Sequence, residues 1–546
     1  MNTNNATIGN SIVRASFSVS IAHILFKLIG LLLVIAAGIY LDGGTYDVVY
    51  AFAFEGCIFS LFLIGDKTIG PAFLPIFKQE IDIHNEQSAW RFANVILTVQ
   101  LLILLFVVFL IFFFPDSVIQ LVTYWTPNHN QAKYMLARKA LLWLLPALVF
   151  LSLGSTTYMI LNGYKRFFLA AFGDVSWKIC VLLSIVIGMG IFQLNYRAII
   201  FGLLVGSMAK LATHLIGLRR EIHFCRLSAM LREPAVKQMF LLLLPLIAGV
   251  IFATIRDVYN NVKILSYLDT EGLMKANSFG RKFYTAIAWL VPYAVSIAMF
   301  PFMCEWANKG DKKRFGDILS QAGRIMLSVF VPFSLVCAVL ALPLSSVLFK
   351  AGHFTITEVR WTAASLSCYI LVLPAYAIEY LIVNAFYAYR KMVLVTVVGI
   401  IFSIVSMAIS YAGIVVFGFQ GTMALAVIAL GYTVSRTLKT TLMICLFKRI
   451  VSFFPFGETI LFLGRTLIVG LVSAGLCMAC RIGFDAYVSS SEAKHVLLVK
   501  LLACGITALV GFMLSVKIVK LKEPVMIYKW AIDYIRSRLN IFVSRC

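Results

Sequence analysis

Charged side chains are rare in the apolar segments of this 546-residue chain, and the few that occur there are the residues best suited to do chemistry. The segment 238–265 holds Arg256, Asp257, Asn260 and Lys263. On an α-helix, Arg256, Asn260 and Lys263 fall on one face at i, i+4 and i+7. Asp257 lies one position further round, where it could pair with a neighbouring helix. The pattern predicts a cationic stripe that binds an anion, and phosphate suits both guanidinium and ammonium groups.

Two further apolar segments carry cations. These are Lys275, Ser278, Arg281 and Lys282 in 275–301, and His23 and Lys27 in 17–41. Gly30 would allow a second helix to approach Lys27 closely. Cations that converge from three helices with few acids require an anionic ligand, because a charge inside a membrane is costly without a partner. For Lys275 and Lys282 the alternative is a position near a helix end, from which a long side chain reaches the lipid headgroups.

Acidic residues in the apolar segments are fewer. Glu55 and Glu379 lack a basic partner on their own predicted helix, so each is a candidate for binding a coupling cation or for pairing with the cationic stripe. Asp174 and Lys178 stand at i and i+4, where mutual neutralisation is the simplest interpretation. The remaining candidates are Asp47 and Asp66, near helix ends where solvation or capping is expected, and His353, which is predicted to lie in a loop.

Membrane-spanning helices must position these residues. The composition, 61% hydrophobic and 13% charged, excludes an ordinary soluble or disordered protein. A bilayer core of about 30 Å needs roughly 20 apolar residues per helix. The segments of that length are 17–41, 48–65, 93–114, 140–162, 167–192, 198–217, 238–265, 275–301, 325–349, 362–388, 393–418, 420–445, 460–480 and 496–516. The predicted fold is an all-α polytopic membrane protein with 14 transmembrane helices.

Basic residues and two repeated landmarks predict how these helices are organised. Lys and Arg gather in the termini and in every second loop, which indicates that both termini are cytoplasmic. Pro75 and Pro301 are separated by almost the same number of residues as Lys165 and Arg390. This spacing predicts two parallel six-helix repeats followed by two extra helices, a plan that some alternating-access transporters use. The predicted domains are an N-terminal lobe (1–220), a C-terminal lobe (221–450), and helices 13 and 14 with a basic cytoplasmic tail (451–546).

Other function classes find little support. The sequence has no Walker loop, HExxH, GxSxG or paired Cys/His metal spacing, so we expect a transporter without a cofactor other than a monovalent coupling cation, whose identity stays open. The eleven cysteines are scattered, as packing residues are, and suggest no disulfide framework. Topology and anionic lipid headgroups explain the net charge of +23, so no nucleic-acid partner is expected.

Four short motifs stand in a fixed order along most of residues 17–450. They are Ala72–Phe77, Ile160–Asn162 with Arg166 and Phe167, Ala351–Phe354, and Asn384–Ala388. In order and spacing they are similar to the AFxP, ILN…RF, GxF and FYA segments of one family. The chain thus resembles the MviN/MurJ lipid II flippases of the multidrug/oligosaccharidyl-lipid/polysaccharide exporter superfamily.

The resemblance also implies roles for individual residues. Arg281 matches the family's helix-8 arginine, which is thought to contact the substrate pyrophosphate, and Lys27 falls at a helix-1 arginine position. Asp47 and Asp66 match acids at the start and near the end of helix 2. The chain departs from the family at Leu33 and Leu61, where arginines are usual, and at Gly280, where an acid is usual.

The function that the resemblance implies is translocation of a polyprenyl-pyrophosphate-linked saccharide, most simply lipid II, across the bacterial inner membrane by alternating access. The implied pyrophosphate-binding residues are Arg281, Lys27, Arg256 and Lys263. The cavity or coupling residues are Asp257, Asn260, Glu55, Asp47, Asp66, Glu379, Ser278 and Lys282. Membrane lipids and the cell-wall synthesis machinery are the expected partners. Three alternatives stay open: a flippase for another lipid-linked polysaccharide unit, a cation-coupled exporter of small molecules, and a scaffold without transport.

Overall fold

The computed structural model describes residues 26, 28–228, 234–290, 292–487 and 494–525, and all regular secondary structure in this part of the chain is helical. The described residues form two compact units. Unit 1 extends to Ser278 and also includes Ala351–Thr355, whereas unit 2 comprises Phe279–Lys350 and the chain from Ile356 onward. Ten of the described helices are long and apolar enough to cross a membrane, or eleven if one bent pair counts as a span. The all-α polytopic fold is confirmed, and the count of fourteen spans stays a prediction.

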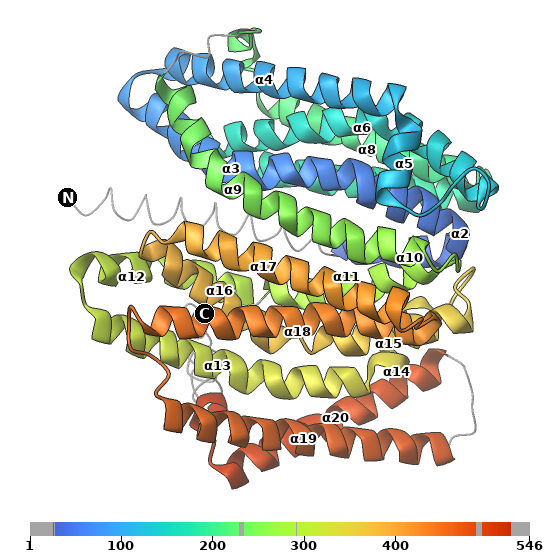
Figure 1. Ribbon diagram of the computed structural model, residues 1–546, viewed down its shortest axis with the longest axis vertical. Coiled ribbons are helices and arrows are strands. Elements are labelled where there is room, and N and C mark those ends of the chain that lie inside the picture. The colour runs from blue at the N-terminus through green and yellow to red at the C-terminus, as the bar shows by residue number, and fades with distance from the viewer. Residues whose placement is uncertain (1–25, 27, 229–233, 291, 488–493, 526–546) are drawn as a thin grey trace, which may run out of the picture. The chain divides into compact units, whose positions relative to one another are not determined.

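Unit 1 is a bundle in which α6 packs against α3, α4 and α8 (Figure 1). Its elements are the helix Leu28–Tyr40, then α2 (Gly43–Thr45), η1 (Tyr46–Phe59), α3 (Ser60–Ile83), α4 (Glu86–Phe113), α5 (Pro115–Val122), α6 (Gln131–Gly163), α7 (Phe167–Leu183), η2 (Ser184–Met189), α8 (Tyr196–Gly217), η3 (Ile222–Phe224), α9 (Pro234–Val258), η4 (Tyr259–Lys263) and α10 (Ile264–Ser266). Its buried side chains are mostly apolar, so the few buried polar groups are candidates for a functional site.

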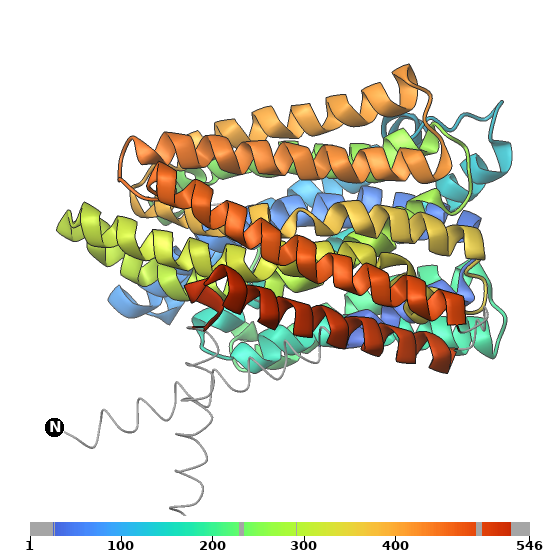
Figure 2. The same cartoon turned by 90° about the horizontal axis from the view of Figure 1, so that it is seen from below.

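Unit 2 contains a second bundle, in which α18 packs against α15, α16 and α17. Its elements are α11 (Leu273–Leu290), which begins in unit 1, α12 (Pro292–Lys309), α13 (Lys312–Val339), α14 (Ala341–Phe349), α15 (Ile356–Ile370), α16 (Leu373–Ala388), α17 (Met392–Tyr411), η5 (Ala412–Val416), α18 (Gly421–Lys448), α19 (Phe456–Tyr487) and α20 (Lys494–Val519). The last two helices lie side by side, and α19 also packs against α13 (Figure 2).

Large apolar side chains cover the outside of several helices. On α4 the exposed residues include Leu102, Phe106 and Phe109, and on α20 they include Leu502 and Leu509. A protein with such apolar surfaces would aggregate in aqueous solution, whereas the acyl chains of a bilayer solvate them well. The exposed residues therefore agree with the predicted membrane location of the helices.

Several predicted helix boundaries differ from the structure, and two of these differences have a clear consequence. The segment predicted as 48–65 belongs to an uninterrupted helix from Gly43 to Ile83, so Asp66 lies inside a helix and not near its end. The segment predicted as 362–388 is divided between α15 and α16, whose axes differ by 43°. Pro374 lies in the first turn of α16, and a proline there cannot donate the hydrogen bond that would continue α15.

The two basic landmarks of the predicted repeat share one backbone conformation. Lys165 follows α6 with φ 60°, and Arg390 follows α16 with φ 57°. In each turn the next residue donates its N–H to a carbonyl five positions earlier at 2.9 Å, Arg166 to Leu161 and Lys391 to Phe386. This is the hydrogen bond of a left-handed helix C-cap. The shared geometry supports the internal repeat, while the predicted domain boundaries at residues 220 and 450 stay predictions.

Candidate functional site

The predicted cationic stripe on α9 begins with an ion pair. Arg256 donates from Nε and Nη2 to Asp257 Oδ1 at 3.0 and 2.7 Å, so Asp257 pairs with its chain neighbour. The side chain of Arg256 is only 10% exposed. Asn260 is also buried. The first part of the stripe is therefore an inward-facing group whose positive charge is offset by Asp257.

Lys263 does not continue the stripe in a regular way. Residues 259–263 form the π-helical segment η4, and the wider turn changes the angular register that an α-helix would give. The Lys263 ammonium donates to the carbonyl oxygen of Leu121 at 2.6 Å and lies 5.2 Å from the Tyr124 ring centroid. Because Leu121 is in the last turn of α5, Lys263 satisfies a helix C-terminus. Its predicted contact with pyrophosphate stays a prediction.

The start of α11 is held by two groups of unit 1. Asp47 accepts hydrogen bonds from the backbone N–H of Gly272 and of Lys275, each at 2.8 Å. The Lys275 side chain is completely buried, and its ammonium donates to Leu41 O at 2.7 Å and lies 4.5 Å from the Phe354 ring centroid. The idea that Lys275 reaches the headgroups is therefore wrong, because its charge is satisfied by a carbonyl and an aromatic face.

The loop motif Ala351–Phe354 has a clear structural role in this arrangement. Gly352 has φ +59°, and a Cβ there would lie 2.1 Å from Ile39 O. His353 donates its backbone N–H to the same carbonyl at 2.9 Å. The loop position predicted for His353 is confirmed. The glycine permits the close approach, and Phe354 then covers Lys275.

Glu55 lies beside the same helix start. It accepts a hydrogen bond from Ser278 Oγ at 3.2 Å, and Tyr46 OH donates to that hydroxyl oxygen at 3.1 Å. The predicted cavity residues Glu55 and Ser278 are thus brought together in unit 1. Glu55 is a carboxylate in a polar, hydroxyl-lined position, which is the chemistry that a monovalent cation or a proton requires.

A second polar cluster lies among α3, α6, α7 and α8, and the sequence prediction for it was partly wrong. Asp174 Oδ1 pairs with Lys210 Nζ at 2.7 Å, not with Lys178. The Lys178 ammonium instead lies 3.3 Å from Phe26 O, in the space beside Gly30. Asp66 accepts from Ser155 Oγ at 2.5 Å. Helical spacing identifies neighbours on one helix, but it cannot exclude a better partner on another helix.

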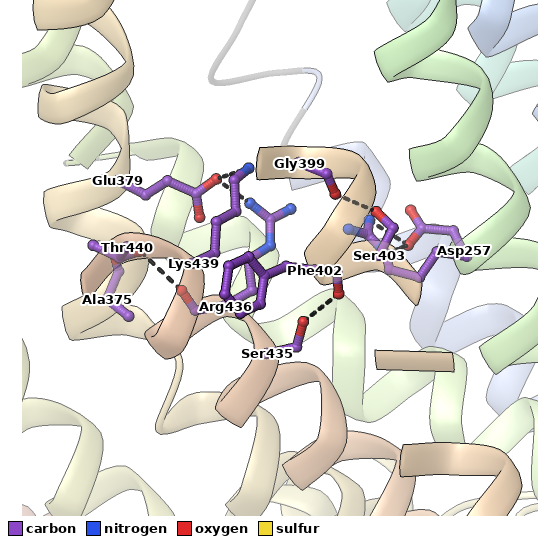
Figure 3. A network of polar contacts seen from close by, with 11 residues as sticks. Asp257, Ala375, Glu379, Gly399, Phe402, Ser403, Ser435, Arg436, Lys439 and Thr440 are labelled. Atoms are coloured by element: carbon purple, nitrogen blue, oxygen red, sulfur yellow. Dashed lines mark hydrogen bonds and ion pairs between the residues drawn. The ribbon is translucent and has the colours of Figure 1, made fainter. Parts of the chain in front are cut away.

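Unit 2 contains a cluster of three charged residues, which we call the Glu379 cluster: Glu379 on α16 with Arg436 and Lys439 on α18 (Figure 3). Glu379 Oε1 accepts from Arg436 Nη1 at 2.6 Å and from Lys439 Nζ at 2.7 Å. One carboxylate therefore faces two cations. The sequence prediction missed both bases, although they stand at i and i+3 in the predicted helix 420–445 and could have been found by the criterion applied to Arg256.

A group of four tyrosines connects Arg436 with α11. The guanidinium carbon lies 4.8 Å from the Tyr376 ring centroid and 5.3 Å from that of Tyr432. Tyr284 contacts both of these rings, with centroids 6.4 and 6.1 Å apart, and also Tyr369 at 5.4 Å. Arg281 stands three residues before Tyr284, so both project from the same face of α11. Arg281, the leading substrate candidate, and the Glu379 cluster thus border one aromatic group.

The predicted substrate residues divide between the units. Arg256 and Lys263 belong to unit 1, Arg281 and Lys282 to unit 2, and Lys282 lies 5.7 Å from the Phe279 ring centroid. Lys27 and His23 are outside the described residues. Convergence of these cations on one substrate therefore stays a prediction.

The departures from the family pattern have distinct surroundings. Leu33 is buried and Leu61 is exposed. At Gly280 a Cβ would lie 2.7 Å from Ser365 Oγ and 2.9 Å from the backbone nitrogen of Leu366. Because α11 and α15 approach so closely there, an acidic side chain would not fit at this position.

A polar clamp outside the spans secures the turn after α6. Arg166 donates to both carboxylate oxygens of Glu221 at 2.8 and 2.5 Å and also to Gly217 O. The hydrogen bonds with Glu221 raise the pKa of Arg166 above its ordinary value. Burial, and then the hydrogen bond to Glu86, raise the pKa of Tyr164. The family-like Arg166 is therefore a structural residue of the turn.

Comparison with known proteins places these observations in a family. The family model described as lipid II flippase MurJ matches residues 40–498. A probable lipid II flippase MurJ of Bdellovibrio bacteriovorus is 23% identical over 77% of this chain and 80% of its own length. The lipid II flippase MurJ of Burkholderia cenocepacia is 24% identical over 62% of this chain and 65% of its own length.

Solved structures agree on the fold. The structure of lipid II flippase MurJ in an inward closed conformation is similar with a TM-score of 0.72 and 19% identity, over 91% of this chain and 98% of that chain. A multidrug resistance MATE family transporter in an inward-facing conformation has a TM-score of 0.64 and 13% identity, over 80% and 98% of the two chains. With a family model that matches most of the sequence, this multi-pass membrane protein belongs to the lipid II flippase MurJ family.

Proposed function

We propose that this protein moves lipid II across the bacterial cytoplasmic membrane by alternating exposure of a cationic site. The observation that carries the proposal is the family match over residues 40–498. The proposal includes cytoplasmic termini, no catalytic step and a position close to the cell-wall synthesis machinery.

In this proposal the charged and apolar parts of the substrate are bound separately. The pyrophosphate binds Arg281, with Lys27, Arg256 and Lys263 contributing positive charge, because guanidinium and ammonium groups are the natural donors for phosphate oxygens. The polyprenyl tail stays in lipid beside the exposed apolar faces of α19 and α20, where Leu471 and Leu509 are examples. The tail then need not cross the interior of the protein.

Reset of the carrier requires an energy source in this proposal. Glu55 is the residue for a monovalent coupling cation, because it lies beside the hydroxyl groups of Ser278 and Tyr46, whereas Glu379 is paired with two cations. Membrane potential alone would also suffice, since moving one charge through 100 mV supplies about 2.3 kcal/mol.

One observation favours a second substrate. The leucines at positions 33 and 61 remove two cations that the family usually offers, so another polyprenyl-pyrophosphate-linked saccharide with a less anionic headgroup is the alternative. It uses the same diphosphate contacts and differs in the group that the diphosphate carries.

The test is rescue of a bacterium depleted of its own lipid II flippase. We expect rescue by the wild type, failure of Arg281→Ala at matched membrane levels, and rescue by the control Lys313→Ala, which removes an exposed cation. Lipid II at the outer face is measured with an added membrane-impermeant enzyme that cleaves it. A correctly inserted wild type that does not rescue would exclude lipid II and leave the alternative saccharide.

A further inference from the structure

Two cations of the Glu379 cluster share one carboxylate. Arg436 and Lys439 share the single oxygen Oε1 of Glu379. Among the described residues, no hydrogen-bond partner lies in reach of Glu379 Oε2 or Arg436 Nε, although both atoms are buried. Buried polar atoms normally have partners, and one that lacks a protein partner needs an explanation such as a functional role, an ordered water or a bound ion. The cluster is therefore incomplete as a purely internal ion pair.

The guanidinium of Arg436 is held ready for a planar partner. The rings of Tyr376 and Tyr432 both lie next to the guanidinium and restrict its motion, which reduces the entropy lost when a ligand binds. The side chains of Arg436 and Lys439 are 15% and 14% exposed, so a ligand that approaches from that exposed edge can reach both. The two cations come from adjacent turns of α18 and therefore lie side by side.

A diphosphate fits this arrangement better than the carboxylate does. Glu379 offers one negative charge to two cations, whereas a diphosphate offers at least two charges and several acceptor oxygens. Those oxygens would satisfy Arg436 Nε as well as the terminal nitrogens and Lys439. Arg281 borders the same aromatic group through Tyr284, so a diphosphate bound at Arg281 has a second set of donors in the same unit.

We propose that Arg436 and Lys439 form a second diphosphate position in unit 2, and that Glu379 occupies these cations until the substrate diphosphate displaces it. This inference rests on the proposed function, since it concerns the headgroup of the same lipid. The carboxylate prevents the two cations from binding other anions while no substrate is present. It also lowers the affinity enough for the diphosphate to leave.

The experiment measures diphosphate binding to the full-length protein in detergent. Farnesyl diphosphate is titrated calorimetrically, with inorganic diphosphate and farnesol as separate arms that distinguish headgroup from tail binding. We expect Arg436→Gln to weaken farnesyl diphosphate binding by about tenfold or more, because one charge-assisted contact is lost. Glu379→Gln should tighten it by roughly threefold or more, since a competing carboxylate is removed. Inorganic diphosphate should follow the same order, and farnesol should bind equally to all variants.

Controls separate this role from simple bracing of α16 against α18. Arg324→Gln breaks another ion pair of unit 2, that with Glu458 at 2.8 Å, and should leave binding unchanged. If the cluster were only a brace, both single substitutions would lower the melting temperature, the double variant E379Q/R436Q would recover it, and diphosphate affinity would stay constant. That result would overturn the inference. Lys439→Gln repeats the test if Arg436→Gln accumulates poorly.

Failure of the proposed function gives a different pattern. If the wild type binds farnesyl diphosphate through Arg436 but does not rescue flippase depletion, the second diphosphate position is supported and lipid II is excluded as the substrate. If the wild type rescues depletion and Arg436→Gln leaves the diphosphate affinity unchanged, lipid II is supported as the substrate and the second diphosphate position is excluded.

Discussion

Asp47 and Lys275 are far apart in the sequence, yet Asp47 Oδ1 accepts the backbone N–H of Lys275 at 2.8 Å while Oδ2 accepts that of Gly272. The carboxylate therefore acts as the N-terminal cap of α11 from another helix. Asp47 is one of the acids that match the family pattern. Its geometry explains why an acid is useful there independently of any transported ligand.

Replacing this cap should weaken the fold. Asp47→Ala leaves two buried N–H groups without an acceptor, and we expect a loss of about 1–3 kcal/mol in the free energy of unfolding. The measurement is the melting temperature of the purified protein in detergent. Asp42→Ala is the control, because Asp42 caps the exposed N–H of Thr45 at 2.8 Å and water can replace it. Equal effects of the two substitutions would contradict the cap.

The pair of Lys210 and Asp174 gives a second stability prediction. Lys210→Met leaves the Asp174 carboxylate of unit 1 without its cation. Loss of one partner of a buried ion pair destabilises a protein by about 3–5 kcal/mol. We expect a smaller loss here, because water can reach part of the Asp174 side chain. The double variant Lys210→Met/Asp174→Asn should recover most of the loss. A melting temperature that the second substitution does not restore would argue against direct coupling.

The ion pair of Asp174 shows which features of the structure can be predicted from the sequence and which cannot. The helices follow from the length of the apolar segments, and the intramembrane charges Arg256, Glu55 and Glu379 are visible by inspection. Their partners are not, because a single sequence shows neighbours on one helix and not the packing of different helices. Asp174 binds Lys210 and not Lys178 for this reason, and η4 alters the register that regular spacing assumes for Lys263. Arg436 and Lys439 also stand in an apolar segment, and the sequence prediction does not include them.

The close contact at Gly280 explains why this chain lacks the acidic residue that the family usually has at this position. Gly280→Ala places a Cβ 2.7 Å from Ser365 Oγ, and we expect a loss of about 1–3 kcal/mol through overpacking. The matched control is Gly464→Ala on α19, where no heavy atom of the described residues would lie within 4 Å of the new Cβ. That substitution should stabilise the helix by roughly 0.5–1 kcal/mol. Thermal unfolding of both variants measures the difference, and a stable Gly280→Ala would contradict the packing argument.

Orientation can be measured with a native cysteine. Cys225 is exposed in the segment between α8 and α9, on the predicted cytoplasmic side. A membrane-impermeant maleimide should label it in inverted vesicles and not in right-side-out vesicles, with Cys225→Ser as the control for other thiols. Labelling in right-side-out vesicles alone would reverse the topology.

The same thiol should show a characteristic pH dependence. Although Cys225 is exposed, desolvation by the surrounding protein raises the pKa of its thiol above the ordinary value, and the thiolate is the reactive form. The labelling rate should therefore keep increasing as the pH rises past the range in which an ordinary cysteine is already ionised. A rate that levels off at the pH typical of a free thiol would contradict the shift.

The left-handed turns at Lys165 and Arg390 predict that glycine is preferred there by conformation. Lys165→Gly should stabilise the turn by about 1 kcal/mol, because glycine has no Cβ to clash at φ 60°. Lys78→Gly inside α3 is the control and should destabilise by about 1 kcal/mol. Melting temperatures that fall for both substitutions would show that the basic side chain contributes more than the backbone.

The same two turns also carry information about ancestry. The residues around them have diverged, Asn162-Gly163-Tyr164 in one half and Tyr387-Ala388-Tyr389 in the other, yet both halves keep one unusual dihedral angle and one hydrogen bond of equal length. The predicted repeat accounts for this agreement, because main-chain geometry can persist where side chains differ. Ancient duplications in other membrane proteins should accordingly be easier to detect by aligning dihedral angles than by aligning amino acids.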